Sequence, residues 1–115
     1  MSQRMLDNHR KGVEPQRVGA VTLSTWMGSS SLQVWDLTSD RISKKYEPLP
    51  RSKKVVSSLA KASLGDFRGT LVLVSHDQGR DALMEAWAQL RDIPNLDVLV
   101  LDGGVEAWSA LMEKQ

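Results

Sequence analysis

Two apolar runs separated by one helix-length segment constrain the fold of this chain most. The first run covers residues 71–74, in a stretch that begins at Gly69, and the second covers residues 98–101, within a strand expected at residues 96–101. Between them, apolar side chains recur at helical spacing at Ala82, Leu83, Ala86, Trp87 and Leu90. The pattern predicts two buried strands joined by a helix, and right-handed crossovers make such strands parallel. Gly103 and Gly104 then permit a tight exit into a last helix whose inward side chains are Val105, Trp108 and Met112.

A short polar loop joins the first run to the helix. It consists of Ser75, His76, Asp77, Gln78, Gly79 and Arg80. Loops at the carboxyl ends of parallel strands, beside helix N-termini, are where open α/β sheets bind their ligands. We therefore predict that these residues form the binding site of the protein. The strand predicted at residues 32–38 brings Asp36 to the same edge of the sheet.

The chain has no cysteine among its 115 residues, and His9 and His76 are its only histidines. This composition excludes disulfides, thiolate metal ligands, cysteine nucleophiles and multi-histidine metal centres, so we expect no metal and no cofactor. The length indicates a single domain. No run approaches the roughly 20 apolar residues of a membrane span, and no secretory segment is recognisable. We accordingly expect a cytoplasmic protein without membrane contact.

The first half of the chain has weaker signals. Residues 1–17 contain breakers and no periodicity, which predicts a flexible N-terminal arm before a domain at residues 18–115. The apolar residues 18–23 suggest an edge strand, with Ser24 capping a brief turn. Further expectations are a short helix at residues 41–46, a strand at residues 53–56, and a helix that Ser57 caps and Gly65 ends.

Charge is unevenly distributed along the chain. Residues 41–61 contain seven basic residues and one acidic residue, whereas residues 62–115 contain four basic and nine acidic residues. A basic segment can bind nucleic acid, but this one lacks the interleaved aromatic side chains of a base-stacking surface. A solvated basic face is therefore the simpler interpretation of residues 41–61, and nucleic acid is not our expected partner.

Residues 100–108, which read VLDGGVEAW, resemble the closing strand, double glycine and helix start of rhodanese domains, the thiosulfate sulfurtransferase family. Asp36 at the end of the early strand and the Leu49-Pro50 segment also fall where that family has similar residues. The resemblance extends over roughly residues 18–112. It implies a three-layer α/β/α fold around a mainly parallel sheet of about four to five strands.

The resemblance also implies an active-site loop of the form Cys-x-x-Gly-x-Arg, whose cysteine carries sulfur as a persulfide. Ser75 occupies the cysteine position and Arg80 the arginine position, while the glycine is displaced by one place to Gly79. A serine oxygen cannot carry a sulfane sulfur, and its hydroxyl is not ionised by a helix terminus alone. Ser75 as a hydrolase nucleophile would need an oriented base, and His76, its immediate neighbour, should point away from it.

The departures favour a catalytically inactive rhodanese-like domain that serves as a binding or regulatory module, with a protein partner. Two alternatives stay open. The first is an oxyanion-binding enzyme or sulfur-relay accessory that uses the loop from Ser75 to Arg80, because an anion would offset the unfavourable placement of Arg80 at a helix N-terminus. Asp77 and Asp81 could instead pair with Arg80 and cap the helix. The second is nucleic-acid binding through residues 41–61.

Overall fold

The structure is a computed structural model that describes residues 15–39, 44–47, 49–76 and 79–114. Its centre is one sheet of five parallel strands in the order β1-β5-β4-β2-β3. The strands are β1 (Gln16–Val18), β2 (Leu32–Asp36), β3 (Lys53–Lys54), β4 (Gly69–Val74) and β5 (Leu96–Leu101). The parallel sheet predicted from the sequence is confirmed, and all of its strand pairs are parallel.

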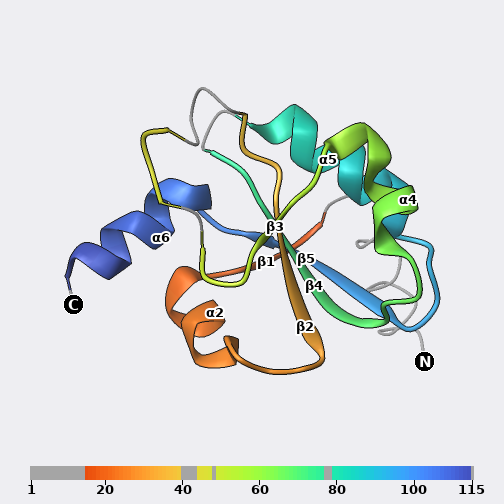
Figure 1. The fold of residues 1–115 in the computed structure, drawn as a ribbon, viewed down its shortest axis with the longest axis horizontal. Coiled ribbons are helices and arrows are strands. Elements are labelled where there is room, and N and C mark those ends of the chain that lie inside the picture. The colour runs from red at the N-terminus through yellow and green to blue at the C-terminus, as the bar shows by residue number, and fades with distance from the viewer. Residues whose placement is uncertain (1–14, 40–43, 48, 77–78, 115) are drawn as a thin grey trace, which may run out of the picture.

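Helices cover both faces of the sheet, as Figure 1 shows: α4 and α5 lie on one side, and α2 and α6 lie on the other. The helical elements are α2 (Ala20–Trp26), the 3-10 turn η1 (Ser57–Leu59), α4 (Ala60–Leu64), α5 (Arg80–Leu90) and α6 (Gly104–Glu113). The predicted three-layer α/β/α architecture is thereby confirmed. It follows from the two long apolar strands, because a strand that is buried on both faces needs a helical layer on each side.

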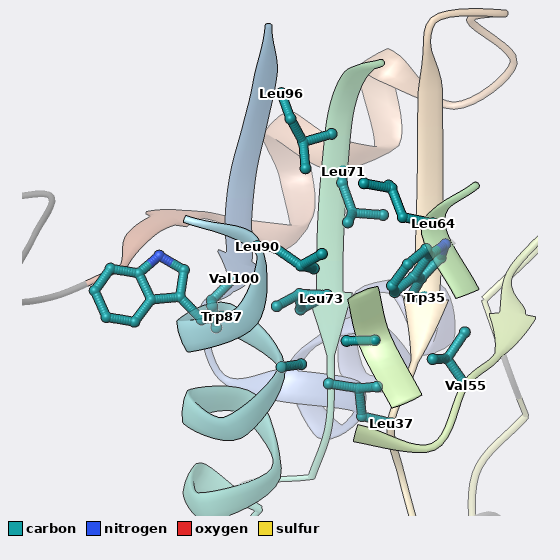
Figure 2. Close-up of a cluster of buried hydrophobic side chains, with 12 residues drawn as sticks. Trp35, Leu37, Val55, Leu64, Leu71, Leu73, Trp87, Leu90, Leu96 and Val100 are labelled. Carbon is teal, nitrogen blue, oxygen red and sulfur yellow. The ribbon is translucent and has the colours of Figure 1, made fainter. Parts of the chain in front are cut away.

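Alternate side chains of the central strand supply two separate cores. Leu71 and Leu73 of β4 point toward α5 and pack with Trp35, Trp87 and Leu90 (Figure 2). Val72 and Val74 of the same strand pack on the opposite face with residues of α2 and α6, namely Leu23, Val105 and Trp108. Trp87 and Trp108 are each 5% exposed. Both tryptophans are therefore core residues, as the sequence indicates.

The N-terminal part of the domain differs from the sequence prediction. Residues 18–23 are not an edge strand: β1 ends at Val18, and α2 begins at Ala20. Ser24 accordingly lies inside α2 and does not cap a turn. Gln16 and Arg17, which the sequence places in the arm, belong to β1, while residues 1–14 lie outside the described residues. Pairing of β1 with β5 extends the sheet beyond what local sequence signals reveal.

The middle of the chain follows the prediction in part. The strand at residues 53–56 is confirmed as the shorter β3, and the helix that ends at Gly65 is confirmed as η1 and α4. Ser57 does not cap that helix, because its hydroxyl donates a hydrogen bond of 2.6 Å to Glu85 Oε1 instead. The helix predicted at residues 41–46 falls largely on residues 40–43, outside the described part, and Lys44 and Lys45 form a turn.

Candidate functional site

The buried polar side chains of the described residues are Asp36, Thr38 and Ser75, and they gather where β2 and β4 end. Asp36 is paired in register with Val74, so the two strands reach the same edge of the sheet together. Asp36 Oδ1 accepts a hydrogen bond of 2.8 Å from the backbone N–H of Thr38. The bond reaches back over two residues, so the carboxylate fixes the backbone just after β2.

Ser75 follows directly after β4 and is only 1% exposed. Its carbonyl oxygen accepts a 2.8 Å hydrogen bond from the N–H of Val105, which fixes the start of α6 against the end of β4. Gly104 makes this approach feasible, since a Cβ atom there would lie 2.2 Å from that same oxygen. Gly104, the second glycine of the predicted tight exit, therefore also packs against Ser75.

The hydroxyl of Ser75 is closed off by Gly79. A Cβ atom on Gly79 would lie 2.0 Å from Ser75 Oγ, so only glycine fits above this side chain. Within the described part of the chain, Ser75 Oγ has no hydrogen-bond partner. The N–H of Gly79 donates to the carbonyl of His76 at 2.8 Å and is used within the loop itself. Ser75 Oγ is therefore inaccessible to a substrate and is not a nucleophile in this conformation.

A cavity of about 280 Å³ opens beside the closed serine. Its lining comes from the ends of β1 and β5, the first two turns of α5, and the loop: Pro15, Arg17, His76, Arg80, Leu83, Met84, Val100, Leu101, Gly103 and Gly104. The order β1-β5-β4 explains why segments so far apart in sequence meet here. Ser75 is absent from this lining, so the cavity lies beside Ser75 and is not lined by its side chain.

The rim of the cavity is basic. Arg17 Nη1 lies 3.1 Å from Asp102 Oδ1, which neutralises part of its charge. Arg80 is exposed at the start of α5, and among the described residues no ion pair involves its guanidinium. The helix also lacks a side-chain cap. An anion at the cavity mouth would thus meet both Arg80 and the N-terminus of α5, whose N-cap residue Gly79 has no side chain to cap it.

Solved structures with the same architecture show what the fold is. A rhodanese-like domain protein from Staphylococcus aureus superposes with a TM-score of 0.59 over 81% of this chain and 90% of its own, at 18% sequence identity. The fold is rhodanese-like. The reduced CoADR-RHD of Bacillus anthracis matches with a TM-score of 0.65 and 10% identity over 87% of this rhodanese-like chain and 17% of its own.

A third neighbour is a protein of unknown function from Rhodopseudomonas palustris that is named as a possible tyrosine phosphatase. It matches the rhodanese-like chain with a TM-score of 0.67 and 13% identity, over 91% of this chain and 87% of its own. No family model matches the sequence. No curated protein matches it either. The likeness is therefore one of fold, and it is far below the identity at which activity follows.

The rhodanese-like domain cannot perform persulfide chemistry with its own side chains, because the chain contains no cysteine. No cluster of three or more His, Asp or Glu side chains that could hold a metal ion occurs in the described residues. No helix of the described part is long and apolar enough to cross a membrane.

The structure brings together only some of the residues predicted as the binding site. His76 and Arg80 line the cavity, whereas Ser75 and Gly79 do not line it and pack against each other beside it. Asp77 and Gln78 lie outside the described residues. Sequence reasoning missed Arg17 and the apolar wall of Leu83, Met84, Val100 and Leu101. The double glycine was the one signal that pointed to this edge of β5.

Proposed function

We propose that this chain is a non-catalytic rhodanese-like domain that works as a binding module, and that its ligand occupies the cavity between α5 and β5. The observation that carries the proposal is the sealed position of Ser75, which is 1% exposed beneath Gly79. A nucleophile must reach its substrate, and this hydroxyl has neither access nor a base within hydrogen-bond distance among the described residues.

The second support for a binding role is the cavity itself. Its lining includes Arg80 and His76 together with Gly103 and Gly104. Concave sites with a few convergent polar groups on an apolar wall are typical of ligand binding. Arg80 has no ion pair among the described residues and lies at a helix N-terminus, where the macrodipole disfavours a cation. A bound anion would offset this unfavourable placement.

Two measurements test this proposal. Incubation with thiosulfate and cyanide should give no thiocyanate above the protein-free background, and turnover would contradict the non-catalytic role. Titration with phosphate, sulfate and thiosulfate should shift the amide resonances of His76, Gly79 and Arg80. If no oxyanion moves these resonances while the protein stays folded, the cavity is not an anion site and the binding proposal fails.

An oxyanion-processing enzyme is the second candidate. The Rhodopseudomonas palustris neighbour is named as a possible tyrosine phosphatase, which makes phosphate esters the natural substrates to try. Release of phosphate from such an ester would need a nucleophile other than Ser75. Hydrolysis of an aryl phosphate by the wild-type protein, lost in Arg80→Gln, would favour this candidate over the binding module. Binding of the same ester without hydrolysis would favour the module.

A further inference from the structure

The cavity beside Ser75 has two unlike walls, and this difference specifies its ligand. We infer that the site takes a small amphipathic anion, with the anionic group at Arg80 and an apolar body against Leu83 and Met84. This inference rests on the proposed function, because it names the ligand class of the same cavity. It goes beyond an oxyanion alone, since an inorganic ion would use only one of the two walls.

The anionic end is assigned from the charges around the opening. Arg80 is exposed, and no ion pair involves it within the described part of the chain. Arg17 also lines the cavity, and its side chain is 56% exposed although it contacts Asp102. A guanidinium presents several N–H donors in one plane, which suits a phosphate or carboxylate better than a neutral group.

The apolar end is assigned from the part of α5 that faces the cavity. Leu83 and Met84 are half-buried and pack against the core between α5 and the sheet. Val100 of β5 continues this wall and is 4% exposed. Arg80 lies one turn before these side chains, because residues three and four apart share a face of a helix. The charged and apolar walls are thus adjacent on a single helix.

The size of the cavity limits the ligand. Its volume of about 280 Å³ is at the lower end of small-molecule sites, so a dinucleotide does not fit within it. A ligand that consists of a single ring or a short alkyl chain with one anionic group would fit a cavity of this size. Phenyl phosphate is a suitable probe, with inorganic phosphate and phenol as its two halves.

The test compares these three compounds on the full chain by titration calorimetry and by the shifts of the Leu83 and Met84 methyl resonances. Phenyl phosphate should bind about tenfold more tightly than inorganic phosphate, because burial of the ring adds to the ionic contact. Phenol should bind more weakly than either, and the methyl shifts should appear only with the ring-bearing anion.

Variants separate the two walls. Arg80→Gln should lower the affinity for phenyl phosphate about tenfold, whereas the matched control Arg68→Gln should leave this affinity unchanged. Arg68 suits this purpose because it donates to the backbone of Gly65 and Phe67 at the opposite end of β4. Met84→Gln should abolish the advantage of phenyl phosphate over phosphate.

Two outcomes distinguish this inference from the proposed function. Equal affinity for phosphate and phenyl phosphate, with no methyl shifts, would overturn the amphipathic ligand and leave oxyanion binding intact. Absence of binding by all three compounds to a folded protein would overturn both. An advantage of phenyl phosphate that survives in Met84→Gln and Arg80→Gln alike would place the ring elsewhere and would also overturn the inference.

Discussion

Ser75 and Gly79 are in direct contact, and this contact determines what the loop can do. The φ angle of Gly79 is −90°, which any residue can adopt, so glycine is needed there for space and not for backbone freedom. In the sequence pattern of active rhodaneses the glycine lies one place earlier. In this chain the glycine is at position 79, and the Ser75 side chain that it covers is buried.

Because Ser75 and Gly79 are in direct contact, adding a methyl group at position 79 should lower the free energy of unfolding considerably. Gly79→Ala should lower the free energy of unfolding by about 1–3 kcal/mol more than Gly19→Ala. Gly19 is a matched control, since it also precedes a helix without a side-chain cap, has a φ of −77°, and has open space where a Cβ atom would lie. Urea denaturation measures both variants, and equal losses would contradict the close packing.

The buried hydroxyl of Ser75, which has no partner among the described residues, makes a second prediction. Ser75→Ala should leave the free energy of unfolding unchanged or raise it by up to about 1 kcal/mol, because it removes a buried polar atom that forms no hydrogen bond there. Ser57→Ala is the control, since its hydroxyl donates to Glu85 at 2.6 Å and its loss should destabilise. A strong destabilisation by Ser75→Ala would show that its hydroxyl has a partner after all.

Gln89 of α5 bridges to both short helical elements that precede it, in addition to the bond between Ser57 and Glu85. Gln89 Nε2 donates to the carbonyl of Ser57 at 2.8 Å, and Gln89 Oε1 accepts from the N–H of Lys61 at 3.0 Å. The bond to Lys61 pairs an N–H in the first turn of α4, which has no side-chain cap, and the bond to Ser57 adds to the one that its carbonyl accepts from the N–H of Ala60. They also fix the helix that carries Arg80, Leu83 and Met84.

Loss of the Gln89 hydrogen bonds should measurably lower the free energy of unfolding. Gln89→Met keeps the size of the side chain and removes both bonds, so it should lower the free energy of unfolding by about 1–2 kcal/mol. Lys61→Ala is the control, because Lys61 contributes its backbone N–H and its side chain is exposed. Equal stability of Gln89→Met and wild type in urea would contradict the role of the bridge.

The sequence predicted the positions of β4, α5, β5 and α6 well because their apolar patterns are long and regular. Met112 is an exception, since it was expected to face inward from α6 and is 38% exposed. It failed for α2, where the segment AVTLSTW contains β-branched residues of low helix propensity and buries only Leu23. Packing between α2 and α6 keeps this segment helical where local propensity does not. The two-residue strand β3 and the three-residue strand β1 depend in the same way on the neighbours that they pair with.

The site was less predictable than the fold. Its residues come from β1, the loop, α5 and the end of β5, and no local pattern connects Arg17 with Met84. Only the strand order brings these segments together. The closure of Ser75 depends on the path of a short loop, and the sequence shows only that a glycine has moved by one place.

At the scale of the whole molecule, the basic segment has an ordinary structural explanation. Its described members are exposed, and two of them contact the domain itself: Lys53 lies 5.9 Å from the Trp35 ring centroid, and Lys54 Nζ donates to the carbonyl of Thr38. We therefore predict no complex with duplex DNA or single-stranded RNA at about 0.15 M salt. Gel-shift measurements test this, and a complex that weakens steeply with salt would contradict it.

The central claim is that position 75 is closed, and a cysteine placed there tests it most directly. Ser75→Cys should react with a thiol-specific disulfide reagent only as fast as the protein unfolds, whereas Ser58→Cys, at an exposed position, should react at once. Ser75→Cys should also give no thiocyanate from thiosulfate and cyanide. Rapid labelling of Ser75→Cys in the folded protein, together with thiocyanate production, would show an open sulfurtransferase site and contradict the account.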